Sequence, residues 1–197
     1  MRSLYLRHRW LAAFTLLLGA CATVPPPVAS WPERRAALQD IGRFGLAGRV
    51  AVAAGSQGFS AGLRWTQRGE LATVELSAPL GIGAARVEQS PSLLRLRTSR
   101  GVEVEGEEAR ELLRHDFGFD PPLESLRYWL LGVGDPASPA AETLDDAQRL
   151  AHLEQGGWSL DYGDYRRAGS QWLPRRLTLR RGEVRVRLLV RDWRLGS

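Results

Sequence analysis

The sequence predicts a mainly β (α+β) fold: an unclosed antiparallel β-barrel, or strongly curved sheet, covered by two or three short helices and holding an apolar cavity. Short runs of alternating apolar and polar residues recur along the chain, separated by Gly, Pro or Ser. Only a few segments space their apolar residues as a helix does. Because one face of nearly every predicted strand is apolar, the sheet must close or be covered by helices.

The N-terminus predicts an export signal over residues 1–20. Basic residues are followed by an uncharged run, 11–18, that is too short to cross a bilayer as a permanent helix. The tetrad Leu18-Gly19-Ala20-Cys21 resembles the lipobox of bacterial lipoproteins and contains the only cysteine of the chain. We therefore expect Cys21 to be the lipid anchor, the alternative being an ordinary signal peptide with an incidental cysteine.

Residues 21–30 are expected to be the lipidated cysteine and a Pro-rich tether, because Pro25-Pro26-Pro27 favours extended chain. Residues 31–197 are long enough for a single half-barrel domain. The formal net charge is +5, and three of the arginines lie in the predicted leader, so the mature chain is close to neutral. The remaining arginines are dispersed, which argues against nucleic-acid binding.

The first half of the mature chain predicts a helix followed by a meander of strands. Pro32 and Glu33 suit the first turn of a helix over 31–41. From Phe44 the apolar period changes to two, and the turn residues 55–58 separate two alternating runs, which predicts a hairpin. Further strands are expected at 71–77, 82–88, 93–98 and 102–105.

The second half predicts two helices and then more strands. Residues 107–115 carry acids in the first turn and bases in the last, which suits the helix dipole. Residues 123–131 follow Pro121-Pro122 and end at Gly132. A loop rich in Gly, Asp, Pro and Ser is expected over 132–146. Strands are predicted at 149–154, 158–162, 174–181 and 183–191.

Alternation also predicts which strand residues face inward. These positions are apolar, and their sequence neighbours are charged or small. The residues expected to line the apolar cavity are Val50, Val52, Phe59, Leu63, Trp65, Val184, Val186 and Leu188.

One connection between predicted strands, Ser77-Ala78-Pro79-Leu80-Gly81, carries an apolar residue at its tip. Pro79 and Gly81 favour a turn that presents Leu80. Two alternatives are open for this leucine. In the first it packs back onto its own sheet. In the second it enters a membrane surface or contacts a lipid-bearing partner.

No convincing catalytic or metal-binding constellation is found. His115 and His152 of the mature chain lack a second ligand at metal spacing, and no cofactor motif is recognised. Ser56 lies in a degenerate form of the nucleophile elbow, but in a hairpin turn where that motif needs a strand-to-helix turn. We therefore expect the chain not to be an enzyme. A surface-anchored hydrolase would require Ser56 to lie near a histidine.

Several motifs follow one another in order behind the lipobox. They are Gly48-Arg49-Val50, Gly58-Phe59-Ser60-Ala61-Gly62-Leu63-Arg64-Trp65, Ala78-Pro79-Leu80-Gly81, Leu126-Arg127-Tyr128-Trp129-Leu130-Leu131-Gly132, Gly157-Trp158, Tyr162-Gly163-Asp164-Tyr165, Leu173-Pro174 and 186–193. With these motifs the chain resembles the LolB family of outer-membrane lipoprotein receptors over most of its expected mature length.

The resemblance implies an unclosed barrel whose cavity takes acyl chains of lipoproteins from the soluble periplasmic carrier LolA and inserts the cargo into the outer membrane. It implies that Leu80 acts in membrane delivery and that Ala22 suits an outer-membrane location. The expected partners are LolA, acylated lipoproteins and outer-membrane lipid. The protein is expected to be a monomer that faces the periplasm. The main alternative is a structural or scaffolding lipoprotein with a dry core.

Overall fold

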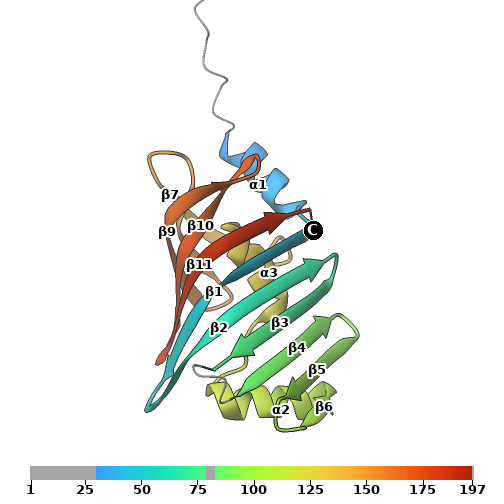
Figure 1. Cartoon of the computed structure of the whole chain (residues 1–197). Helices are drawn as coiled ribbons and strands as arrows, with labels where there is room; N and C mark the ends of the chain where they lie inside the picture. Colours follow the sequence, from blue (N-terminus) through green and yellow to red (C-terminus); the bar gives the residue numbers. More distant parts are fainter. Residues whose placement is uncertain (1–29, 79–82, 197) are drawn as a thin grey trace, which may run out of the picture.

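The computed structural model describes residues 30–78 and 83–196, which form an 11-stranded antiparallel sheet and three helices (Figure 1). In chain order the elements are α1 (Trp31–Gln39), β1 (Arg43–Ala54), β2 (Gln57–Arg68), β3 (Leu71–Ser77), β4 (Ala84–Ser90), β5 (Leu93–Thr98), β6 (Glu103–Glu105), α2 (Gly106–Phe117), α3 (Leu123–Leu131), β7 (Ala140–Leu144), β8 (Leu150–Gln155), β9 (Trp158–Ala168), β10 (Gln171–Arg181) and β11 (Val184–Leu195). No helix of this described part is long and apolar enough to cross a membrane.

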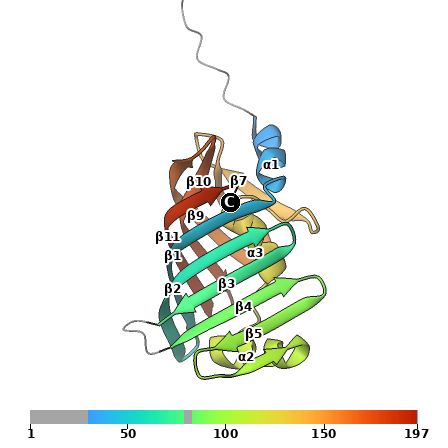
Figure 2. The same cartoon turned by 45° about the vertical axis from the view of Figure 1, so that its right-hand side comes forward.

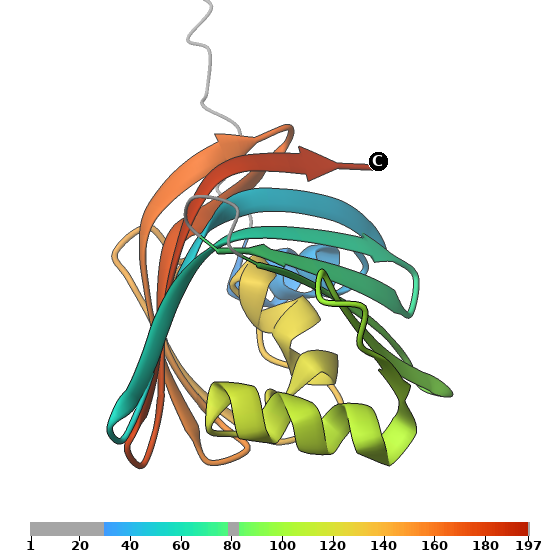
Figure 3. The same ribbon diagram turned by 60° about the horizontal axis from the view of Figure 1, so that its bottom comes forward.

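The strand order shows that the sheet is an unclosed barrel. It runs β6-β5-β4-β3-β2-β1-β11-β10-β9-β8-β7, so the first and last strands of the chain are neighbours at its centre. The edge strands β6 and β7 lie at opposite ends of this order. Seen end-on, the sheet is a strongly curved wall, with α3 inside the curve and α2 across the open side (Figure 3). The predicted fold class is confirmed.

The central strands bury alternate residues, as their sequence predicts. Phe44, Leu46 and Val52 of β1 are buried, whereas Arg43 and Arg49 are exposed. Directly opposite residues point to the same face of an antiparallel pair, and inward pairs such as Leu46–Trp65 and Val50–Leu188 extend this apolar face across three strands. The apolar side is the concave side, where the helices pack.

A β-bulge between β1 and β11 depends on Gly48. The register shifts between Ala47 and Gly48, where the partner changes from Asp192 to Val190. A Cβ atom on Gly48 would overlap the carbonyl oxygen of Leu189, far inside van der Waals contact. Only glycine allows this close approach, and a bulge of this kind increases the local bend of the sheet.

Local signals set the ends of the helices. Glu33 accepts a hydrogen bond of 2.9 Å from the Ser30 backbone N–H at the start of α1, and Pro32 follows in the first turn. Gly132 ends α3 in the left-handed conformation, with φ of 78°, and its N–H bonds to the carbonyl of Trp129. The three predicted helices are thus confirmed, with ends that differ by at most two residues.

A buried amide fixes α3 against the far side of the sheet. Gln155 at the end of β8 accepts a hydrogen bond of 2.7 Å from the Trp129 indole N–H and one of 2.9 Å from the Asp135 backbone N–H. Its own amide group donates to the carbonyl oxygens of Asp135 and Ser138. This saturated network holds the chain after α3 in place without leaving the Gln155 side chain unpaired.

Several predicted element bounds are wrong. Strand β9 continues to Ala168 instead of ending at 162, and β11 continues to Leu195 instead of ending at 191. The loop expected over 132–146 contains strand β7, which is a short edge strand paired only with β8. Strand β10 begins at Gln171 rather than Pro174. Proline is tolerated there because the ladder to β11 starts only at Arg176, and the Trp193 indole N–H donates to the Pro174 carbonyl instead.

Candidate lipid-binding cavity

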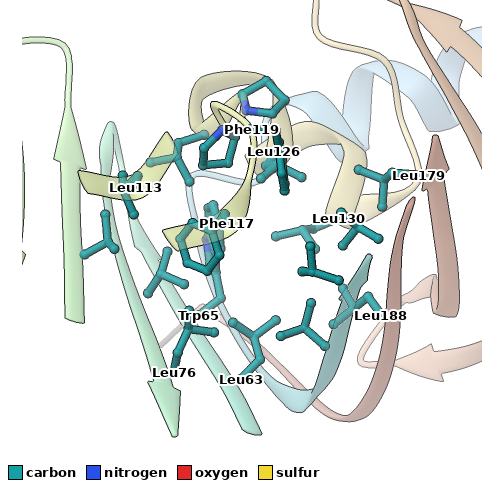
Figure 4. Close-up of a pocket in the computed structure, with 18 of the residues that line it drawn as sticks. Leu63, Trp65, Leu76, Leu113, Phe117, Phe119, Leu126, Leu130, Leu179 and Leu188 are labelled. Carbon is teal, nitrogen blue, oxygen red and sulfur yellow. The ribbon is translucent and has the colours of Figure 1, made fainter. Parts of the chain in front are cut away.

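An apolar cavity lies between the concave face of the sheet and the helices α2 and α3. Its volume is about 120 Å³, and only apolar surface faces the space. Figure 4 shows the lining side chains surrounding an open centre, with Leu63, Phe117 and Leu188 among those labelled. The complete lining is Val50, Val52, Phe59, Leu63, Trp65, Val74, Leu76, Val87, Leu113, Phe117, Phe119, Pro121, Pro122, Leu123, Leu126, Leu130, Trp158, Leu179, Val186 and Leu188.

Most of the predicted cavity residues surround this space. Val50, Val52, Phe59, Leu63, Trp65, Val186 and Leu188 all line it, from strands β1, β2 and β11. Val184 does not. It is the first residue of β11 and pairs with Ala54 at the hairpin end of the strands, where it packs against the core outside the cavity.

Eight lining residues come from α2, α3 and the segment between them, which alternation along strands does not reveal. Leu113 and Phe117 belong to α2, Leu126 and Leu130 to α3, and Phe119 to the connection between the two helices. The sequence contains a signal for them, because apolar residues, aromatic residues and prolines cluster over 117–123 after an amphipathic helix. That signal indicates an apolar covering segment but not which strands it covers.

Aromatic side chains join the two sides of the cavity. Phe59 of β2 contacts Phe117 of α2, with ring centroids 5.2 Å apart, and Phe119 packs edge-on to Trp158 of β9 at 5.7 Å. Phe117 and Phe119 are themselves 6.4 Å apart. The rings therefore form a continuous connection from one part of the sheet across the helices to another. Phe59, Phe117 and Phe119 are only half-buried.

Few polar atoms lie near the cavity, and most of them have hydrogen-bond partners outside it. The Trp65 indole N–H donates to Gln67 at 3.0 Å, and the Gln67 amide donates to the carbonyl of Gly69. Trp158 also lines the cavity, and its indole N–H has no acceptor within the described residues. No acidic or basic residue is among the lining residues in the described part of the chain. The site is therefore suited to binding hydrocarbon and offers no group for acid–base chemistry.

Both histidines in the described part of the chain make contacts with acids at the surface. The exposed His115 contacts Asp116 at 3.0 Å, and His152 contacts Asp161 at 2.8 Å and Glu154 at 2.9 Å. The hydrogen bond to Asp161, together with that to Glu154, raises the pKa of His152 above 6.5. Ser56, in the turn between β1 and β2, hydrogen-bonds to neither histidine in the described part of the chain.

Three sets of predicted functional residues lie outside the described residues. They are the signal over 1–20, the anchor Cys21 with the following tether residues up to 29, and the loop residues Pro79, Leu80 and Gly81.

A curved antiparallel sheet with helices against its concave side and an apolar cavity between them defines a half-barrel protein. The same fold is seen in the crystal structure of a LolA superfamily protein from Nitrosomonas europaea, with a TM-score of 0.54 and 9% sequence identity over 86% of this chain and 94% of that chain. At this identity the likeness concerns the fold alone.

Sequence comparison identifies the family. The family model for outer membrane lipoprotein LolB matches residues 42–193. The outer-membrane lipoprotein LolB of Alkalilimnicola ehrlichii is 39% identical over 187 residues, which is 92% of this chain and 93% of that protein. That of Nitrosococcus oceani is 36% identical, over 92% of this chain and 94% of its own. The chain belongs to the LolB family of outer-membrane lipoproteins.

Proposed function

We propose that this protein is an outer-membrane receptor that takes acylated lipoproteins from the periplasmic carrier LolA and inserts them into the outer membrane. The acyl chains of the cargo bind in the cavity between the sheet and α2 and α3. The protein itself is held on the periplasmic face of the outer membrane by lipid on Cys21, and residues 22–30 serve as its tether.

The observation that carries this proposal is a cavity wall built from uncharged side chains in a chain that belongs to the LolB family. Burying acyl chains is worth about 0.8 kcal/mol per methylene, so a lipoprotein with several chains must be shielded during transfer through water. Direct transfer from one apolar cavity to another avoids most of that cost. A structural lipoprotein with a filled core would have no use for such a space.

The size of the cavity indicates that it must widen to bind cargo. One water molecule needs roughly 10–15 Å³ of such space, so 120 Å³ corresponds to about ten water molecules. That is less than the volume of a lipoprotein's acyl chains. Because α2 packs mainly on the edge strands β5 and β6, displacement of α2 would enlarge the cavity without disturbing the central strands.

A transfer assay tests the proposal. The chain from Ala22 onward, without the leader and Cys21, keeps every element described and is mixed with LolA that carries an acylated lipoprotein. We expect the cargo to move to this chain and to co-purify with it in solution. A cargo protein whose cysteine is not acylated is the matched control and should not transfer. Failure to capture the acylated cargo would contradict the proposed function.

Leu80 is the residue that we propose for membrane delivery, because an apolar side chain at this loop can enter the lipid surface and a charged one cannot. Leu80→Glu should leave cargo binding unchanged and reduce transfer of bound cargo to vesicles at least about tenfold. Leu71→Glu, at another exposed leucine, is the control and should deliver cargo normally. Delivery by Leu80→Glu at the rate of the unmodified chain would exclude this role.

A further inference from the structure

The convex face of the sheet points away from the cavity and carries two groups of arginines. One group is paired with acids and the other is not. Toward the β6 edge the outward arginines are paired with acids. Arg64 and Arg86 share Glu75, at 3.3 and 3.1 Å, and Arg97 contacts Glu103 at 2.8 Å. Toward the β7 edge, Arg180 pairs with Asp161, which also binds His152. These arginines on both flanks are therefore neutralised by neighbouring acids.

The centre of the same face is different. Arg49 of β1, Arg176 of β10, and Arg187 and Arg191 of β11 line one open groove of about 1000 Å³. All four are exposed, and within the described residues none has a carboxylate within 4.0 Å. We call these four residues the arginine groove. Four unpaired cations on adjoining strands repel one another, so this surface favours an anionic partner.

The floor of the arginine groove is shallow and partly apolar. Small residues such as Ala51, Ser60 and Gly62 form its base, so a partner can approach the backbone of the sheet closely. Leu189 lies among the arginines and is 46% exposed, one of the few large apolar side chains at the surface. An exposed leucine surrounded by guanidinium groups offers apolar contact and phosphate binding in one place.

We propose that the arginine groove binds the phosphate groups of anionic membrane lipids and so holds the convex face of the sheet against the membrane. Guanidinium groups bind phosphate through paired hydrogen bonds, and each basic residue near an anionic lipid surface strengthens binding appreciably. The exposed Leu189 favours a lipid surface over an acidic protein segment, because it can contact the region just below the headgroups.

This orientation has a structural consequence that is visible in Figure 2. The convex side of β1 to β5 faces the viewer there, and α2 and α3 lie behind the sheet. A membrane bound at the convex face would leave the helix-covered side, with the cavity, turned toward the periplasm. The proposal concerns the placement of the protein on lipid and does not depend on the cargo function, because it requires no occupant in the cavity.

Vesicle flotation tests the proposal with the chain from Ala22 onward, which carries no acyl anchor. We expect it to bind vesicles of phosphatidylcholine with phosphatidylglycerol, to bind pure phosphatidylcholine poorly, and to detach as salt is raised. The triple variant Arg49→Gln, Arg176→Gln, Arg187→Gln should bind the anionic vesicles about a hundredfold more weakly. Unchanged thermal unfolding and unchanged cargo binding would show that the variant remains folded.

The matched control removes the same charge from the same face. The control triple variant Arg64→Gln, Arg86→Gln, Arg97→Gln removes three arginines that are already paired with acids. It should weaken binding by no more than about threefold.

Equal losses in the two triple variants, or no binding by the unmodified chain, would overturn the proposal. Displacement from vesicles by millimolar inorganic phosphate at constant ionic strength would overturn it in favour of a free-anion site. Normal vesicle binding by the groove variant, with slower uptake of cargo from LolA, would overturn it in favour of a carrier-docking site.

Discussion

The wall of the cavity is built residue by residue from the alternation of β1, β2 and β11. Inward positions such as Val50, Leu63 and Leu188 are apolar, and their neighbours Arg49, Arg64 and Leu189 point outward. A period of two fixes the face of each residue, so these lining positions could be predicted from the sequence alone. Leu113, Phe117 and Leu126 could not, because a helical pattern says which side of a helix is apolar but not where the helix docks.

A single polar substitution in the wall should weaken binding of acyl chains. Leu63 is half-buried and lines the cavity, so Leu63→Gln introduces an amide that loses its water when the ligand binds. We expect roughly tenfold to hundredfold weaker binding of a lipopeptide, measured by calorimetry. The exposed Leu71 gives the control, and Leu71→Gln should bind normally. Equal affinities in both variants would place the ligand outside this cavity.

The His152 contacts predict a measurable titration. Asp161 and Glu154 raise the pKa of His152 above 6.5, so nuclear magnetic resonance should show a midpoint above that value, and Asp161→Asn should lower it. Because the folded-state pKa is the higher one, the contribution to stability is complete below the unfolded-state value. It is lost as the pH rises through the folded-state value. A midpoint at or below 6.5 would show that these contacts do not persist in solution.

The sequence predicts some helices and strands better than others. The hairpin of β1 and β2 and the helix α3 were predicted because alternation and flanking turn residues agree. Strand β7 was missed because its sequence, Ala-Ala-Glu-Thr-Leu, has weak strand propensity and gains its order from main-chain pairing with β8. The start of β10 was missed because proline usually interrupts a strand, whereas Pro174 is tolerated here because the ladder to β11 begins only at Arg176.

The bulge between β1 and β11 gives a prediction at this scale. Gly48→Ala would force a Cβ atom against the Leu189 carbonyl oxygen, which cannot move without breaking the strand pair. We expect the free energy of unfolding to fall by about 3 kcal/mol in denaturant titration. A Cβ atom at Gly42, just before β1, would meet no other atom within 4 Å, and Gly42→Ala should change stability by no more than about 0.5 kcal/mol. Similar losses at both glycines would refute the role of the bulge.

At the scale of the whole molecule, the first and last strands, β1 and β11, pair at the centre of the sheet. The helices α2 and α3 connect the two edge strands across the concave side. The sequence indicated that an apolar face needed covering and that few helices were available. It did not indicate which strands form the edges. The gathering of unpaired arginines at the centre of the convex face therefore becomes apparent only from the strand order, which places β1, β11 and β10 side by side.

The most direct test of the central claim is to locate the acyl chain of a bound lipoprotein. A lipoprotein that carries a photoreactive group in its acyl chain is bound to the chain from Ala22 onward, irradiated and mapped by mass spectrometry. We predict crosslinks to cavity residues from both walls, such as Leu63, Leu188 and Phe117. Crosslinks confined to the convex face, or none above the level of an unacylated control, would contradict the proposal that this cavity holds the cargo.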